Sequence, residues 1–389
     1  MEGLEWLYAA LRQEPYGMLP ISNLSGKSPS SIKQIEQLAS YNWIVDDTTE
    51  KEPTIVTPGA PNAILLDWIG GKLENDSGIL FFDLNHAAMP KCPMDPLFHA
   101  VRLQHGDDYD FQQFDFITDS INLQKLFTFC KGTEDGLFRI DLERVGRTVI
   151  ATRIESQDWL GIDFESYDKS MRERMTKPVS KMTDGPFFQI QKYKFGDLNM
   201  LVRFEAHCSD YSKMPDTALE EAAAALNVEP EKQEKKKFEG AEGNLHYINI
   251  GKRQKHTLVL TTTYPAGKDF PSFVYPQLLF SGADQLLLGW FKAHGDFQKP
   301  AYYSLSDMNR LVKPLPYSTV AKTNSCVQKM VNFMRMCEDD ARVTFMWATG
   351  DKLEIYERSN EADTGISSTM RASLLKQVPS KNETDEATK

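Results

Sequence analysis

Hydrophobic and polar residues alternate along the chain in two pairs of segments, and each pair is joined by a short glycine-containing turn. The first pair is residues 136–143 and 148–155 around Gly146, and the second is Phe187–Phe195 and Leu198–Ala206 around Gly196-Asp197. A period of two is typical of β-strands, and a short turn between two such segments joins antiparallel neighbours. The pattern therefore predicts two antiparallel hairpins.

Apolar residues at helical spacing and short apolar runs predict the other elements. The predicted helices span 32–40, 95–104, 121–130, 219–226, 273–280 and 326–337. The predicted strands span 78–82, 114–117, 246–250, 256–263, 286–290, 343–347 and 353–356. Paired antiparallel strands with helices between some of them favour an α+β fold, a mixed, largely antiparallel twisted sheet flanked by helices.

The same patterns predict one large domain with irregular additions. An N-terminal wrapping segment covers residues 1–77, and an α+β core covers 78–358. Residues 229–243 are charged and nearly free of apolar side chains, so 211–243 is predicted to be an exposed insertion. Residues 359–389 lack periodicity and are predicted to be a disordered tail.

Composition narrows the class of protein. The 389 residues carry 44 Lys+Arg and 55 Asp+Glu, a net charge of −11, which argues against strong non-specific nucleic-acid binding but leaves room for a local basic groove. Five widely spaced cysteines argue against a disulfide framework and indicate a reducing compartment. The acidic start and the lack of a long apolar run predict no signal peptide, no membrane span and a cytoplasmic or nuclear location.

Familiar catalytic signatures are missing from the sequence. It has no GxGxxG motif that opens a helix, no P-loop lysine, no GxSxG elbow and no HExxH zinc motif. A prenyl diphosphate synthase needs two aspartate-rich sites on facing helices to hold Mg²⁺. The pairs Asp46-Asp47, Asp107-Asp108 and Asp339-Asp340 do not have that arrangement, so the sequence predicts that they are solvated surface acids.

Several segments resemble a family of filamentous-fungal proteins that are often labelled geranylgeranyl pyrophosphate synthetase. The segments that carry the resemblance are 41–44, 53–55, 58–59, 116–126, 138–141, 201–205 and 276–278. Typical members have Glu-x-Asp on one strand, Glu-x-Lys on a later strand, and then a Pro-Gln-Leu helix and an apolar strand. That order resembles the catalytic core of the DXO-type decapping exoribonucleases, which have the (D/E)xK nuclease fold.

The resemblance implies a metal-dependent chemistry and a set of positions for it. Carboxylates on adjacent strands hold divalent metals that activate water, and the lysine stabilises developing charge. The upstream acid falls on Glu155, and Glu-x-Asp falls on Glu205 and His207. Glu-x-Lys falls on Asn249 and Gly251, so three of these five catalytic positions are replaced.

The predicted substrate-binding residues are Gln277, Arg203 and Lys252, and the predicted metal ligands are Glu155, Glu205 and His207. His207 is either a metal ligand or a polar residue that fills a vacated site. Glu155 and Glu205 either remain functional or pair with Arg153 and Arg203. The aromatic residues near these positions either stack nucleic-acid bases or belong to the core; they are Tyr193, Phe195, Phe204 and Tyr247.

These positions lead to one main hypothesis and two alternatives. The main hypothesis is a catalytically degenerate nuclease-fold protein that is a binding or regulatory module for RNA ends or a protein partner, with no cofactor or with weakly bound Mg²⁺ or Mn²⁺. The first alternative is an active metal-dependent hydrolase that acts on RNA 5′ ends. The second is the prenyl synthase that the family label implies. The oligomeric state is left open.

Overall fold

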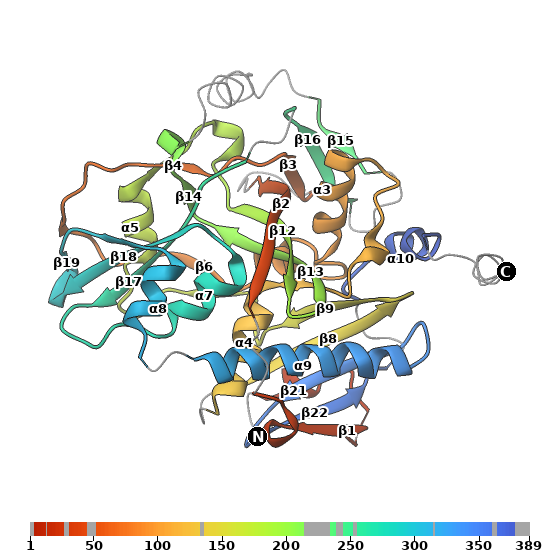
Figure 1. Ribbon diagram of the computed structural model, residues 1–389. Coiled ribbons are helices and arrows are strands. Elements are labelled where there is room, and N and C mark those ends of the chain that lie inside the picture. Colours follow the sequence, from red (N-terminus) through yellow and green to blue (C-terminus); the bar gives the residue numbers. More distant parts are fainter. Residues whose placement is uncertain are drawn as a thin grey trace.

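Two large β-sheets, a short two-stranded ribbon and the helices packed on them make up the described part of the chain (Figure 1). The structure is a computed structural model. It describes residues 4–12, 14–26, 31–44, 52–132, 136–213, 234–238, 244–251, 255–313, 316–359 and 364–377.

The first sheet has twelve strands in its described part, and most neighbours in it are antiparallel. Its strands in spatial order are β1 (Gly17–Pro20), β22 (Lys352–Glu357), β21 (Arg342–Trp347), β8 (Phe138–Val145), β9 (Thr148–Ile154), β7 (Phe116–Asp119), β13 (Leu198–Ala206), β12 (Phe187–Phe195), β2 (Ile32–Trp43), β3 (Thr54–Thr57), β16 (His246–Asn249) and β15 (Lys236–Lys237). The strands β9, β7 and β13 run parallel to one another, as do β3 and β16. The mixed, largely antiparallel sheet of the predicted α+β fold is confirmed.

Both predicted hairpins are confirmed, since β8 pairs with β9 and β12 pairs with β13. Their turns require glycine. Gly146 and Gly196 have φ values of +63° and +59°, in the left-handed region that most residues avoid. A β-carbon on Gly196 would also lie 2.7 Å from the Asn324 side chain, so the second turn has no room for another residue.

The second sheet continues from the end of β13. Its strands in spatial order are β11 (Thr176–Lys177), β4 (Asn62–Ile64), β14 (Cys208–Ser209), β17 (Leu258–Pro265), β18 (Gln285–Lys292), β19 (Asp296–Phe297) and β5 (Gly71–Lys72), and β20 (Ala301–Tyr303) also pairs with β18. After Ala206 the chain leaves the first sheet and immediately forms β14 of the second. The two sheets therefore meet at His207, which lies between these strands.

Helices in the described part of the chain cover both faces of the first sheet, and two of them pack on strands of the second sheet instead. They are α1 (Glu5–Tyr8), α2 (Leu84–Ala88), α3 (Asp95–His105), α4 (Ser120–Lys131), α5 (Asp168–Met175), α7 (Val274–Ser281), α8 (Leu305–Leu311), α9 (Tyr317–Met336) and α10 (Ser368–Leu375). Alternate residues of β13 divide the core: Met200 and Val202 pack with α4, α7 and α9, and Leu201 packs with α3 and α10. The side chains of Tyr193, Phe195 and Phe204 are buried in the first of these cores.

The helix predicted over residues 32–40 is wrong, because this segment is the long strand β2 (Ile32–Trp43). The apolar residues Ile32, Ile35 and Leu38 have helical spacing, but Ile35 is 47% exposed. The strand pairs with β12 on one side and with β3 on the other. These non-local backbone hydrogen bonds outweigh the local helical preference, which is worth only a fraction of a kcal/mol per residue, roughly 0.7 at most.

The predicted disordered tail at 359–389 is wrong over residues 368–375, which form α10. The side chains of Ile366, Met370 and Leu374 are at most 2% exposed and pack in the core beside α3. Helix α3 begins at Asp95 as predicted, and Met94 occupies its N-cap position without a side-chain cap hydrogen bond.

Much of the predicted insertion at 211–243 lies outside the described residues. Residues 234–238 are described and contain β15, which pairs with β16. The N-terminal segment supplies β2 and β3 to the first sheet, and the boundary predicted at residues 77 and 78 stays a prediction. None of the helices in the described ranges combines the length and apolar character needed to cross a membrane.

Candidate functional site

Carboxylates gather where three parallel strands end at one edge of the first sheet. Asp119 ends β7, and Glu155 and Glu205 lie at or just beyond the ends of β9 and β13. Since β7 separates the other two strands, Glu155 and Glu205 lie on backbones about 9–10 Å apart, which is two interstrand spacings. The resemblance implies carboxylates on adjacent strands, but here β7, with Asp119 at its end, lies between the strands of Glu155 and Glu205.

Asp119 is held by Arg203. The Nε and Nη2 atoms of Arg203 donate to the two Asp119 carboxylate oxygens at 2.6 and 2.9 Å, and Nη1 donates to the Pro93 carbonyl at 2.8 Å. Burial by itself would lower the pKa of Arg203, but the Asp119 carboxylate raises it above its ordinary value. The Arg203 side chain is fully buried and has a structural role, and its predicted role in binding substrate stays a prediction, since Arg203 also lines the hollow described below.

Two further carboxylates have basic partners beside this pair. Arg153 Nε donates to Asp83 at 2.7 Å, and Lys125 Nζ donates to Glu155 at 2.6 Å. Burial would raise the pKa of Asp83, but the Arg153 charge and its hydrogen bond lower it overall. Arg153 also lies 3.6 Å from Glu155, so the predicted pairing of these two residues is present as a longer contact.

Glu205 pairs with Arg172 of α5 rather than with Arg203. The Arg172 Nη1 to Glu205 Oε1 distance is 3.3 Å, and these side chains are 33% and 39% exposed. We call the four acids of this edge and their partners the carboxylate cluster: Asp83 with Arg153, Asp119 with Arg203, Glu155 with Lys125, and Glu205 with Arg172. Each acid in the cluster therefore lies against a cation that the protein itself supplies.

His207 lies at the junction of the two sheets and its ring is already bonded. Its Nδ1 atom accepts a hydrogen bond from the Thr261 backbone N–H at 2.8 Å and lies 2.9 Å from the Thr261 hydroxyl. Burial, followed by the nearby Arg172 charge, lowers the pKa of His207 well below its usual range. The ring is therefore neutral at neutral pH, with its proton on Nε2 because Nδ1 is an acceptor.

A second threonine of β17 extends this arrangement. Thr263 lies two residues after Thr261, and its backbone N–H and hydroxyl both donate to Asp168 Oδ1, at 2.7 and 2.9 Å. Burial raises the pKa of Asp168 despite these hydrogen bonds. Asp168 and Arg172 are one helical turn apart, so α5 places one acid and one base over the strands that carry His207 and Thr261.

The structure does not bring Asn249 and Gly251 to His207. They lie at the end of β16, where Asn249 pairs with Thr57 of β3. The strand beside His207 is β17, because Cys208 pairs with Val259. The exposed Asn249 side chain accepts from Gly251 N–H at 3.0 Å, and Gly251 has φ of +113°, so these two residues form a surface turn.

Of the two remaining predicted substrate-binding residues, the structure describes only Gln277. Lys252 lies outside the described residues. Gln277 is half-buried on α7, which packs against α4 and β13. Tyr247 packs against the buried Phe238 with 4.4 Å between ring centroids, at the border of the core that contains α3.

The residues present do not fit a divalent metal ion. In the described part of the chain, no three His, Cys, Asp or Glu side chains are grouped so that they could hold one. A metal-ligating histidine donates its second ring N–H to an acceptor, whereas His207 Nδ1 accepts from a backbone N–H. If His207 bound a metal through Nε2, that nitrogen would lose its proton while Nδ1 still accepts a hydrogen bond. The ring would then have to be an imidazolate anion. Glu155, Glu205 and His207 are therefore a poor ligand set.

A hollow of about 190 Å³ opens beside the cluster. Asp119, Arg153 and Glu205 supply charged walls. Its apolar lining is formed by Phe81, Phe82, Leu84, Ile121, Phe188 and Phe204. The hollow thus joins the carboxylate cluster to an apolar surface that includes β6.

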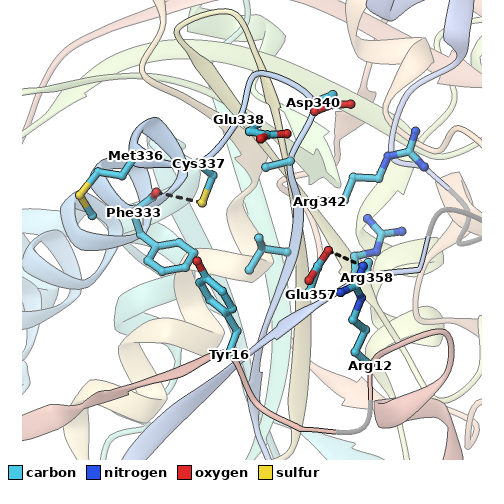
Figure 2. A pocket seen from close by; sticks show the side chains of 12 residues that line it. Arg12, Tyr16, Phe333, Met336, Cys337, Glu338, Asp340, Arg342, Glu357 and Arg358 are labelled. Atoms are coloured by element: carbon cyan, nitrogen blue, oxygen red, sulfur yellow. Dashed lines mark hydrogen bonds and ion pairs between the residues drawn. The ribbon is translucent and has the colours of Figure 1, made fainter.

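A larger hollow of about 860 Å³ lies elsewhere, between the end of α9, β21, β22 and the N-terminal segment (Figure 2). Tyr16 and Phe333 form one wall with a centroid distance of 5.8 Å. On the opposite wall Arg12 pairs with Glu357 at 2.8 Å. It contains none of the predicted catalytic, metal-binding or substrate-binding residues. Two of its three arginines are neutralised, since Arg358 pairs with Asp141 at 3.1 Å.

Sequence reasoning missed half of the carboxylate cluster. Asp119 takes the N-cap position of α4, but its carboxylate makes no cap hydrogen bond and binds Arg203 instead. Asp83 does cap a helix, α2, and also binds Arg153. Arg172 had one weak signal, since the buried Met171 and Met175 have the i, i+4 spacing of a helix that carries it.

Comparison by sequence places the chain in a family without an assigned function. The family model described as "Domain of unknown function (DUF8563)" matches residues 22–362, and the chain belongs to this family. No curated protein matches it by sequence. The matched range ends before α10.

Comparison by structure shows the fold. Rai1 from Scheffersomyces stipitis, in complex with (3'-NADP)+ and calcium ion, has a TM-score of 0.57 at 11% identity over 93% of this chain and 98% of its own. Candida albicans Rai1, in complex with pU5-Mn2+, has 0.56 at 10% identity over 93% and 99%. K. lactis Dxo1, in complex with manganese, has 0.52 at 8% over 91% and 98%. The chain has the nuclease-like Rai1 and Dxo1 fold, which confirms the DXO-like resemblance.

Proposed function

We propose that this chain is a nuclease-fold protein that does not cleave RNA and instead binds a partner at the edge of its first sheet. The observation that carries the proposal is the carboxylate cluster, in which each acid is neutralised by an arginine or lysine of the same chain. A catalytic metal site needs carboxylates whose charge is left for the ion. Here guanidinium and ammonium groups use that charge.

The strand pairing supports the proposal and revises the positions of the catalytic pattern. The strand beside His207 is β17, so we assign the Glu-x-Lys pattern to Thr261 and Thr263 instead of Asn249 and Gly251. Both assignments leave the pattern without its carboxylate and its lysine. Threonine hydroxyls are weak substitutes for a carboxylate ligand, and they carry no charge to stabilise a transition state.

The likeness to Rai1 structures supports a nucleotide or RNA ligand as the ancestral occupant of this edge, since one neighbour was solved with pU5 and manganese. In this chain two acids of the catalytic pattern, Glu155 and Glu205, are retained, while its other positions are replaced. Binding without hydrolysis is what such an edge can still do. The prenyl-synthase label is a separate hypothesis, which the fold does not support.

The test is Mn²⁺ titration by calorimetry together with a cleavage assay on 5′-phosphorylated oligouridine RNA. We expect no binding heat and no released nucleotide with the full chain. Mn²⁺-dependent cleavage that disappears in Glu205→Gln would overturn the proposal. Glu205→Gln is a fair probe because the side chain is partly exposed and the amide keeps its shape.

A variant that restores carboxylates tests whether the Glu-x-Lys pattern falls on Thr261 and Thr263. The variant Arg172→Ala, His207→Asp, Thr261→Glu removes the internal cation and supplies two carboxylates beside Glu205. We expect this variant to bind Mn²⁺. The matched control replaces Thr261→Glu by Asn249→Glu, which adds the same charge on the exposed end of β16 and should bind none. Binding by the control alone would show that the assignment to Thr261 is wrong.

A further inference from the structure

An exposed apolar ribbon stands beside the carboxylate cluster. It consists of β6 (Ile79–Phe81) and β10 (Trp159–Gly161), which pair antiparallel, with Phe81 opposite Trp159. The exposed fractions are 53%, 39%, 42% and 40% for Ile79, Leu80, Phe81 and Phe82, and 55% for Trp159. Because alternate residues of a strand point to opposite faces, four consecutive exposed apolar residues mean that both faces of the ribbon meet solvent.

Such a surface is unusual in a protein without a partner. Contiguous exposed apolar patches mark interaction sites, and soluble proteins protect edge strands with charged residues or proline. Neither strand of this ribbon contains Lys, Arg or Pro. In the described structure β6 and β10 pair only with each other, so the ribbon presents backbone groups at its edges as well as apolar side chains.

The ribbon is held firmly in place. Phe82 N–H donates to the Asp158 carbonyl at 2.7 Å, and Ile162 N–H donates to the Gly78 carbonyl at 2.9 Å. The buried Asp76 carboxylate accepts from the backbone N–H groups of Lys169 and Ser170 at 3.0 and 2.8 Å, which ties the start of the ribbon to α5. A rigid surface loses little conformational entropy when a partner binds.

The charge around the ribbon selects between kinds of partner. Residues 76–83 and 155–165, which form the ribbon and its flanks, contain six acidic residues and no lysine or arginine. Three of these acids are already bonded inside the protein, Asp76, Asp83 and Glu155, so the negative charge that meets solvent lies mainly on the exposed Asp163 and Glu165. The adjacent Arg153 is paired with Asp83, whereas the exposed Lys169 ammonium donates to the Ser77 carbonyl and keeps its positive charge, so two exposed acids and one exposed cation flank the ribbon. RNA binding depends on lysine and arginine contacts to phosphates, so this surface disfavours RNA and favours a cationic partner.

The hollow of about 190 Å³ lies against the same surface, since Phe81 and Phe82 form part of its wall. A cavity of about 150 Å³ can hold benzene, so this hollow has room for one apolar or aromatic side chain. Glu205 at its rim is available to a basic group as well as to Arg172. A partner segment with an apolar side chain next to a basic one therefore fits the hollow, the apolar side chain against its apolar lining and the basic group at Glu205.

We infer that the β6–β10 ribbon and the adjoining hollow are the docking surface for a segment of a partner protein that carries alternating apolar and basic side chains. This inference rests on the proposed function, because it names the partner of the same edge. The two fail separately: cleavage in Mn²⁺ would overturn the proposed function, whereas the ribbon variants below leave every member of the carboxylate cluster in place.

The test measures binding of labelled short peptides to the full chain by fluorescence anisotropy. The probes are an alternating Leu-Lys peptide, an alternating Leu-Glu peptide of the same length, and 5′-phosphorylated oligouridine RNA. We expect the Leu-Lys peptide to bind at least about tenfold more tightly than the other two. The double variant Phe81→Ser, Trp159→Ser should weaken that binding by about tenfold or more.

Two control variants separate the ribbon from general effects. Tyr317→Ser, Met336→Ser removes apolar side chains that are 67% and 80% exposed on α9, and it should leave peptide binding unchanged. The second variant, Asp163→Asn, Glu165→Gln, is a further test of the same surface, because it removes charge but no apolar area. It should weaken binding of the Leu-Lys peptide, and it keeps the inference testable if the serine variant does not fold. Circular dichroism checks folding in each case.

Several results would overturn the inference. One is equal affinity of the Leu-Lys peptide for the native chain and both ribbon variants. Another is equal affinity of the native chain for the Leu-Glu peptide. RNA binding that requires Phe81 and Trp159 would assign the surface to nucleic acid. A dimer in sedimentation that dissociates in the serine variant would assign it to a second copy of the chain.

Discussion

At the scale of single residues, Arg203 shows how a charged side chain can be a structural element. Its guanidinium bonds both oxygens of Asp119, the Pro93 carbonyl and, at 3.2 Å, the Tyr41 hydroxyl. Tyr41 in turn donates to Asn85 at 2.5 Å. Arg203 thus links β13, β7, β2 and the segment before α3, and it can do so because every donor has an acceptor.

We predict that Arg203→Met lowers the free energy of unfolding by about 3–5 kcal/mol, because the buried Asp119 loses its cation. The control is Arg12→Met, whose arginine is 66% exposed and pairs with Glu357, and which should cost at most about 1 kcal/mol. Urea denaturation of both variants measures the difference. Equal losses would contradict the structural role of Arg203.

At the scale of elements, α10 shows that a short helix without a strong sequence pattern can belong to the core. Ser367 caps it by accepting from Met370 N–H at 3.2 Å, and Ser367 N–H donates to Asp95 of α3 at 3.0 Å. Gln377, just after the helix, donates to the Tyr109 carbonyl at 2.7 Å. The helix is therefore fixed at both ends to the layer that covers one face of the first sheet.

We predict that Met370→Ala lowers the free energy of unfolding by about 2–5 kcal/mol, the cost of a cavity in a close-packed core. Leu375→Ala, one turn further on and 41% exposed, should cost less than about 1 kcal/mol. Urea denaturation compares the two. A negligible loss for Met370→Ala would mean that α10 does not pack on the core in solution.

At the scale of the whole molecule, an excess of eleven negative charges is combined with histidines that are buried without charge. Burial lowers the pKa of His256 to about 4 and, together with Arg102, lowers that of His99 to about 3. The rings pack on aromatic side chains, His256 on Phe187 and His99 on Phe238. In the unfolded chain both would have a pKa of about 6.5.

The sign of the pH effect follows from these values. Between pH 6.5 and about 4 the unfolded chain binds protons that the folded protein does not, so stability falls as the pH decreases through this window. Each histidine contributes a slope of up to about 1.4 kcal/mol per pH unit. We predict a shallower slope for His256→Phe and an unchanged slope for His294→Asn, an exposed position. Urea denaturation between pH 4 and 6.5 measures how the free energy of unfolding depends on pH. Equal slopes of that dependence for the native chain and for His256→Phe would contradict the prediction.

Local signals in the sequence determined the hairpins, α4 and the apolar strands of both sheets. Gly146 and Gly196 mark turns that only glycine fits easily, and Gly132 ends α4 with φ of +74°. The period of two and the period of 3.6 follow from local backbone geometry, so they can be seen in one sequence. The acids at 155 and 205 were singled out by the resemblance to a known family and not by this periodicity.

Only the tertiary structure decided which neighbours those residues have. Residues 32–40 form a strand because β12 and β3 supply partners, and His207 meets Thr261 because β14 pairs with β17 rather than β16. The partners Arg172, Lys125 and Asp83 come from distant parts of the chain. Sequence spacing does not encode such contacts, because strand order and ion pairing depend on the free energy of the whole packed chain.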